Sequence, residues 1–226
     1  IDEIDGKETI SVAIMPCTAK KHEAGRSEFQ REGIPDVDYV ITTQEIAMMI
    51  KESGLVFSEL EAEATDMPFG LASGAGVIFG VTGGVTEAVV RRIAQDKTVA
   101  GLQQIAFTGV RGMAGLKEAT IPYGEKEIKI AIVSGLGNAD QLIRKIKAGE
   151  VHYDLVEVMA CPGGCISGGG QPFALKAAQT ERGKGLYRSD KLSQIKRSEE
   201  NPMIMALYNG LLKGKTKELL HVHYEK

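Results

Sequence analysis

Short apolar, β-branched runs alternate along the chain with segments whose apolar residues recur at helical spacing. The apolar runs predict strands at residues 9–15, 37–42, 105–107, 128–133 and 153–159. Helical patterns cover 43–53, 86–93, 142–146 and 203–212. Thr43 is expected to cap the first of these helices and Gly54 to stop it. This alternation predicts an α/β fold, with a mostly parallel sheet flanked by helices.

No internal repeat, heptad run or low-complexity linker divides the chain, so residues 1–226 are interpreted as one unit. From about residue 173 the β character disappears and helical patterns remain, which predicts a helical tail.

The net charge and the lack of long apolar segments argue against several classes of function. The formal net charge is -3, without the basic stripe that neutralises phosphates, so nucleic acid is not expected as a partner. No window approaches 18 consecutive apolar residues, and the first residues lack the pattern of a signal peptide, so neither a membrane span nor secretion is indicated. The chain begins at Ile1, which fits a mature product or a fragment. Cytoplasm is the default location, with the periplasm left open.

The three cysteines are candidate ligands. Their odd number does not make a disulfide framework, so they are expected to be reduced. Cys17 follows one predicted strand, and Cys161 and Cys165 follow another. Thiols at the carboxyl ends of parallel strands can converge at one edge of a sheet, where open α/β folds bind their ligands.

The Cys-Pro-Gly-Gly-Cys loop at 161–165 favours an iron-sulfur cluster, because its amides can face bridging sulfides. A zinc site normally shows paired Cys-x-x-Cys or histidine ligands, and the close histidine pair lies in the tail. Buried or incidental cysteines are the remaining interpretation. Close approach of backbone to a cofactor would explain the glycines near this loop, at 163, 164, 168, 169, 170 and 183. A second glycine-rich segment, 73–84, also indicates a close backbone approach.

These motifs resemble the iron-only hydrogenases. Residues 15–23 carry the signature MPCxxKxxE, and residues 157–172 carry ExMACPGGCxxGGGQP. The similarity extends through 73–85, 135–139 and 218–224, and so covers essentially the whole chain. It implies one half of a two-lobed catalytic domain that reversibly reduces protons to hydrogen.

The resemblance also implies the cofactor. Cys17, Cys161 and Cys165 would bind a 4Fe-4S cluster, and Cys165 would bridge to a diiron subsite with carbon monoxide, cyanide and a dithiolate. The two parts together are the H-cluster. Lys20 would donate a hydrogen bond to an iron-bound cyanide, against the alternative of a solvated lysine.

Three further side chains, Met15, Phe79 and Met159, would wall the diiron site, against the alternative of ordinary core packing. Glu23 and Glu157 lie inside the motifs, and a structural role is expected for them in place of proton transfer.

The family's first signature, TSCCP, is absent from this sequence, and with it the fourth cluster ligand and a proton-relaying cysteine. We therefore expect a partner that supplies this ligand, either an N-terminal half or a companion subunit, and no activity from the chain alone. Without that half an apolar face would be exposed, which predicts aggregation or tight association. A ferredoxin-like or other redox protein would exchange electrons.

Three alternatives stay open. The related iron-sulfur assembly factors of the nuclear prelamin A recognition factor type lack the diiron subsite, but typically end in tryptophan, and this chain has no tryptophan. A sensory hydrogenase-like module would bind the H-cluster and signal. A fragment that folds without metal would be iron-free and colourless.

Overall fold

The computed structural model describes residues 9–66, 70–94 and 115–222, so the strand predicted at 105–107 lies outside the described residues. The contacts of the chain divide it into two compact units. The first unit comprises 1–63, 168–173 and 210–226, and the second comprises 64–167 and 174–209. The grouping of residues 1–226 into one domain stays a prediction.

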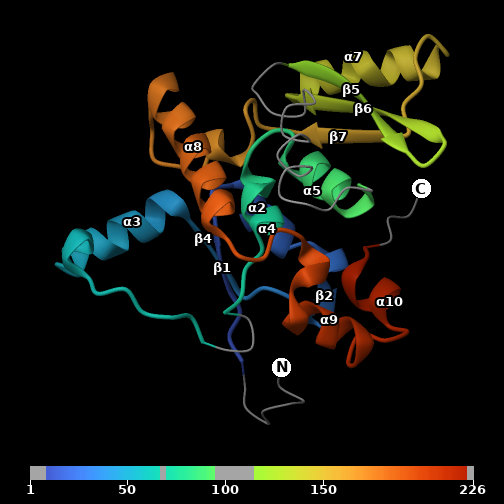
Figure 1. Cartoon of the computed structure of the whole chain (residues 1–226). Coiled ribbons are helices and arrows are strands. Elements are labelled where there is room, and N and C mark those ends of the chain that lie inside the picture. Colours follow the sequence, from blue (N-terminus) through green and yellow to red (C-terminus); the bar gives the residue numbers. More distant parts are fainter. Residues whose placement is uncertain (1–8, 67–69, 95–114, 223–226) are drawn as a thin grey trace. The chain divides into compact units, whose positions relative to one another are not determined.

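The first unit is built on two parallel strands, β1 (Val12–Met15) and β4 (Tyr39–Thr42), with Val12 opposite Tyr39 (Figure 1). A hairpin of β2 (Gln30–Arg31) and β3 (Ile34–Pro35) lies between them in the sequence. The other elements of this unit are α2 (Ala19–Ala24), η1 (Ser27–Phe29), α3 (Thr43–Glu52), η2 (Phe57–Glu59) and α10 (Thr216–Leu220). Arg31 donates to the carbonyls of Glu218 and Leu219, which ties α10 to the hairpin.

Helix α3 begins with a capping box. Thr42 Oγ1 accepts from the Glu45 amide at 3.2 Å, and the Glu45 carboxylate accepts from the Thr42 amide at 2.8 Å. The N-cap is therefore Thr42, one residue before the predicted Thr43, which itself starts the helix. The Thr42 amide, and next Lys21, lower the pKa of Glu45 to about 2.

The second unit contains a three-stranded sheet covered by a helix on each face (Figure 1). Strand β6 (Lys126–Ser134) pairs antiparallel with β5 (Leu116–Tyr123) and parallel with β7 (Leu155–Met159). Ile130 and Ile132 pack toward Val90 of α5 (Gly84–Ile93). Ala131 and Val133 pack toward Leu142 of α7 (Leu136–Lys147). Burial on both faces explains the uninterrupted apolar residues 130–133. The α/β fold is confirmed, although β5 is antiparallel and was not among the predicted strands.

The glycine-rich segment forms two short helical turns, α4 (Gly74–Val77) and η3 (Ile78–Gly80), before α5. Helix α5 starts at Gly84, two residues before the predicted start at Thr86. A Cβ at Gly84 would lie 1.8 Å from the carbonyl oxygen of Ile78, and Gly83 has a φ of 89°. Only glycine fits this turn.

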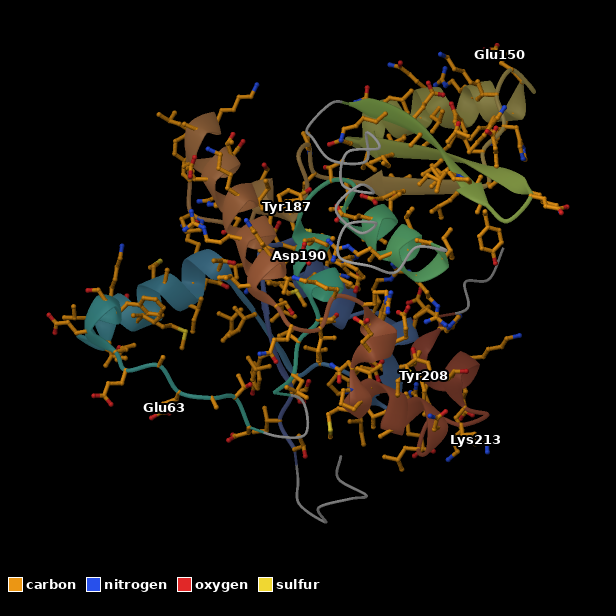
Figure 2. The ribbon with its side chains drawn as sticks, in the orientation of Figure 1. Glu63, Glu150, Tyr187, Asp190, Tyr208 and Lys213 are labelled. Carbon is orange, nitrogen blue, oxygen red and sulfur yellow. The ribbon has the colours of Figure 1, made fainter. Side chains whose placement is uncertain are left out.

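The region after residue 173 contains three helical segments of the second unit: α8 (Lys176–Leu192), η6 (Ser198–Glu200) and α9 (Pro202–Asn209). Tyr187 and Asp190 project from α8 (Figure 2). Tyr187 packs against the buried cluster of Ile78, Val81 and Ile166. No described helix combines the length and apolar composition needed to cross a membrane.

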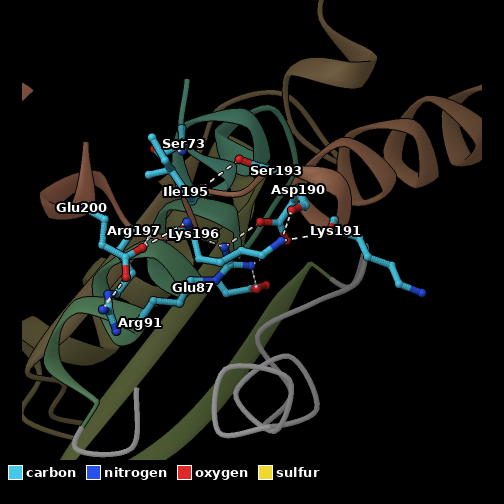
Figure 3. A network of polar contacts seen from close by, with 11 residues as sticks. Ser73, Glu87, Arg91, Asp190, Lys191, Ser193, Ile195, Lys196, Arg197 and Glu200 are labelled. Atoms are coloured by element: carbon cyan, nitrogen blue, oxygen red, sulfur yellow. Dashed lines mark hydrogen bonds and ion pairs between the residues drawn. The ribbon is translucent and has the colours of Figure 1, made fainter. Parts of the chain in front are cut away.

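Helices α5 and α8 are joined by a buried ionic network (Figure 3). Arg91 donates to both oxygens of Asp190 at 2.7 Å and to Glu87 at 2.5 Å. Burial alone would lower the pKa of Arg91, but the two carboxylates outweigh it and raise the pKa. Lys196 supports the same region by donating to the backbone carbonyls of Asp190 and Lys191.

Candidate metal-binding loops

Each of the two cysteine loops follows a strand of a parallel pair. Strand β1 ends at Met15, just before Pro16 and Cys17, in the first unit. Strand β7 ends at Met159, just before Ala160 and Cys161, in the second unit. The three cysteines form no disulfide and are partly buried. The predicted placement of the cysteines at strand ends is confirmed.

The loop of Cys17 is held by Gly170, one of the glycines that follow Cys165 in the sequence. The Gly170 amide donates to the carbonyl of Pro16 at 3.2 Å, and the Gly170 carbonyl accepts from the Gln44 amide at 2.9 Å. A Cβ at Gly170 would lie 2.8 Å from the Cys17 amide nitrogen. This glycine therefore allows a close approach to the protein's own backbone. Its approach to a cofactor stays a prediction.

Met15 and Lys20 line a cavity of about 120 Å³ in the first unit. Its apolar lining includes Phe29, Val37 and Val40. The Lys20 ammonium lies 2.5 Å from Glu23 Oε1, and both side chains are about two-fifths exposed, at 42% and 38%. Lys20 is thus already paired with a carboxylate. Its role toward a cyanide ligand stays a prediction, as does the role of Met15.

The Cys161–Cys165 loop makes a tight turn through two glycines in the left-handed region, with φ values of 86° at Gly163 and 96° at Gly164. The Gly163 amide donates to Ser134 Oγ at 2.8 Å, and the Gly164 amide donates to the Cys161 carbonyl at 3.0 Å. These two amides are therefore engaged within the protein, which differs from the expectation that they face cluster sulfides.

Gly164 also lies against the turn that carries Phe79. A Cβ at Gly164 would lie 2.9 Å from the Gly80 carbonyl oxygen and 2.8 Å from the Thr82 amide nitrogen. Phe79 is 45% exposed, so it is not an ordinary core residue. Met159, partly buried, ends the strand before the same loop. The second unit thus places both residues on segments that border the loop, while their contact with a cofactor stays a prediction.

Glu157 has a structural role. Its carboxylate accepts from the amides of Gly83 and Thr86, each at 2.7 Å, and so caps the start of α5. Its side chain is buried. Nearby, burial lowers the pKa of Lys117, and the charge of Glu157 opposes that shift.

Ser134, Arg91 and Asp190 were not predicted as structural or site residues. Ser134 follows the predicted strand 128–133, and that position at a strand end is the only sequence signal for it. Arg91 and Asp190 are 99 positions apart, and no local pattern links them.

The donor set has the chemistry of an iron-sulfur site, because cysteine thiols that form no disulfide are the ligands that such clusters use. Within the parts of the chain that the structure describes, no group of three or more Cys, His, Asp or Glu side chains is arranged to hold a metal. The three-cysteine site therefore stays a prediction.

Comparison with known families identifies the chain. Residues 1–169 match the family described as iron only hydrogenase large subunit, C-terminal domain. The chain belongs to the iron-only hydrogenase family. Residues 176–226 of this hydrogenase chain match a second family, described as iron hydrogenase small subunit. The helices after residue 173 thus correspond to a region that has a family description of its own.

Relatives of this hydrogenase chain include the NADP-reducing hydrogenase subunit HndD of Solidesulfovibrio fructosivorans, which is 43% identical over 99% of this chain and 39% of the relative. The cytosolic iron-sulfur assembly component 3 of Mus musculus is 34% identical over 94% of this chain and 47% of the relative. The apo [FeFe]-hydrogenase HydA1 of Chlamydomonas reinhardtii, variant C377H, is similar in structure, with a TM-score of 0.74 and 36% identity over 99% of this chain and 65% of the other. The hydrogenase chain spans less than half the length of these two curated relatives.

Proposed function

We propose that this chain forms part of the H-cluster site of an iron-only hydrogenase, an enzyme that reversibly reduces protons to molecular hydrogen. The observation that carries the proposal is the pair of cysteine loops, each at the carboxyl end of a parallel strand and each within a motif of this family. Backbone contacts support an ordered conformation of each loop within its own unit.

Cys17, Cys161 and Cys165 would hold a 4Fe-4S cluster through their thiolates, with Cys165 also bridging to the diiron subsite. The H-cluster supplies the electron transfer and the hydrogen chemistry, and the protein binds it, orients it and excludes water. Within the first unit, segment 168–173, which follows Cys165 in the sequence, packs on the Cys17 loop.

The remaining site residues would shape the surroundings. Lys20, held by Glu23 at the wall of the cavity, would present its ammonium to an anionic ligand of the diiron subsite. Met15, Phe79 and Met159 would keep water away through polarizable and apolar surface.

A fourth thiolate would come from a companion segment or subunit, because a 4Fe-4S cluster takes four ligands and this sequence has three cysteines. The first unit supports such a partner. Its parallel sheet has only two strands among the described residues, and Ile10, Val12 and Ile14 are between 49% and 66% exposed. Parallel sheets are normally covered on both faces, so this apolar surface suits a partner polypeptide. A ferredoxin-like protein would exchange electrons with the assembled site.

Infrared spectroscopy tests this function. The chain would be purified anaerobically, reconstituted with iron and sulfide, and incubated with a synthetic diiron cofactor. The first sample would contain the chain alone. The second would contain the chain together with a polypeptide that carries the family's first cysteine signature. We expect carbonyl and cyanide bands only in the second sample, and their loss in Cys17→Ser, Cys161→Ser and Cys165→Ser. The control is Met48→Leu, which removes the sulfur of an exposed side chain of α3. This variant should keep the bands.

The similarity to the mouse assembly component favours a second candidate, a non-catalytic iron-sulfur assembly factor. Iron-sulfur absorption without carbonyl or cyanide bands in either sample would support that function. For location we propose the cytoplasm, where thiols stay reduced. Cell fractionation with detection of the native protein checks this, and recovery from the periplasm would contradict it.

A further inference from the structure

The end of strand β6 holds the chain on both sides of Cys161. On one side, the Gly135 amide donates to the carbonyl of Met159 at 2.8 Å. On the other side, Ser134 Oγ accepts from the Gly163 amide at 2.8 Å. The residues before and after this cysteine are therefore both bonded to the neighbouring residues Ser134 and Gly135.

Ser134 is itself fixed in place. It is 3% exposed, and its amide donates to the carbonyl of Gly115 at 2.8 Å. Its carbonyl accepts from Asn138 Nδ2 at 2.7 Å, and Thr82 Oγ1 lies 3.5 Å from its hydroxyl. Since its backbone is bonded in both directions, the hydroxyl is a fixed acceptor in a buried setting, where a hydrogen bond is costly to lose.

The bond also decides where one amide of the loop points. Gly163 lies between Cys161 and Cys165, and its N–H is the kind of donor that tunes an iron-sulfur cluster when it faces a sulfide. Ser134 takes this donor instead. A cluster on the two cysteines would therefore receive one hydrogen bond fewer from the loop, which favours its oxidised form and lowers its reduction potential.

We propose that Ser134 is the positioning residue of the Cys161–Cys165 loop, and that its hydroxyl sets both the shape of the loop and the reduction potential of a cluster bound there. The part that concerns the potential rests on the proposed function. The part that concerns the shape stands on the protein alone.

Amide hydrogen exchange on the full 226-residue chain without metal tests the shape. In the wild type the Gly163 amide should be protected, although it lies in a loop. Ser134→Ala should reduce this protection by about tenfold, the order expected for one buried hydrogen bond, and Ser134→Thr should restore it. Ser73→Ala is the matched control, because the Ser73 hydroxyl is also buried and accepts an amide, from Gly76 at 3.3 Å, away from this loop. It should leave Gly163 unchanged.

The potential is measured by redox titration of the chain reconstituted with iron and sulfide, in the presence of the polypeptide that supplies the fourth cysteine. Ser134→Ala should shift the midpoint potential upward, because the freed amide can turn to a cluster sulfide. Ser134→Thr and Ser73→Ala should keep the wild-type potential.

Either of two results overturns the proposal: an unprotected Gly163 amide in the wild type, or a Ser134→Thr variant that behaves like Ser134→Ala. A wild-type potential in a folded Ser134→Ala chain also overturns the part on tuning. If Ser134→Ala does not fold, wild-type exchange and Ser134→Thr still decide the shape. Failure of the wild type to bind any cluster would refute the proposed function, while hydrogen exchange would still decide the role of Ser134.

Discussion

Arg91 and Asp190 form a buried ion pair with two hydrogen bonds of 2.7 Å, which fastens helix α5 to helix α8. Removing the charge of Asp190 leaves Arg91 with Glu87 as its remaining charged hydrogen-bond partner in the network. We expect Asp190→Asn to lower the free energy of unfolding by roughly 3 kcal/mol, as for other broken buried pairs. Urea denaturation followed by circular dichroism measures the change.

Asp140→Asn is the matched control for this prediction. Asp140 pairs with Arg144 at 2.9 Å, but both side chains are more than half exposed, at 60% and 78%. Its loss should change the free energy of unfolding by no more than about 0.5 kcal/mol. Equal effects of the two substitutions would contradict a stabilising role for the buried network.

Gly170→Ala should loosen the loop of Cys17. The added methyl group would lie 2.8 Å from the Cys17 amide nitrogen and 2.9 Å from the Pro16 carbonyl carbon, so backbone must move. We expect the Cys17 thiol to react several-fold faster with a thiol reagent, measured in a chain whose other two cysteines are serine. Gly137→Ala, in helix α7 with open space around its Cβ position, should leave the rate unchanged and stabilise the helix by about 0.5–1 kcal/mol. A similar rate for both variants would refute the steric argument.

The start of α3 should respond to acid through Glu45. Its pKa falls from 4.5 in the unfolded chain to about 2 in the folded one, so the carboxylate stabilises the capped end above pH 4.5. This contribution is lost as the pH falls from 4.5 through 2. Carboxyl-carbon NMR titration should show the low value, and Lys21→Met should raise it. Lys51→Met, at the other end of the helix, should leave the pKa of Glu45 unchanged. A Glu45 pKa near 4.5 in the wild type would contradict the capping box.

Tyr153 should lose its proton at a higher pH than an ordinary tyrosine. Its hydroxyl donates to the carboxylate of Glu118, which raises the pKa of the phenol from 10.0 to about 12. The folded state keeps this proton between pH 10 and 12, so the contribution to stability is complete below pH 10 and disappears as the pH rises through 12. The difference in absorbance at 295 nm between wild type and Tyr153→Phe isolates this group. Glu118→Gln should move the transition toward pH 10, and no movement would show that the carboxylate is not the cause.

The strands that end at the cysteine loops could be predicted because each is a short apolar run closed by a distinctive residue or motif. β1 stops before Pro16, and β7 stops before the Cys-Pro-Gly-Gly-Cys loop. Strand β5 was missed because polar and apolar residues mix along it, and Pro122 argues against a strand. It is stabilised by pairing with β6, which is a tertiary effect.

The glycines show which structural features the sequence predicts and which it does not. A glycine cluster indicates that backbone must come close to something, and the contacts of Gly84, Gly164 and Gly170 confirm that much. The sequence does not say what comes close. At these three positions it is the protein's own backbone, from segments that are remote in the chain for Gly164 and Gly170. The partner of a buried hydroxyl such as Ser134 is equally invisible before the fold is known.

The first unit draws its residues from both ends of the chain, since 1–63 are completed by 168–173 and 210–226. During synthesis the segment with Cys17 therefore emerges long before the glycines that fix its loop. At 5–20 residues per second the wait is on the order of ten seconds. In that interval the loop around the Cys17 thiol is not yet complete. The thiol of a nascent chain would therefore be open to premature metal binding or oxidation. Loading of the metal only after translation ends would avoid premature metal binding.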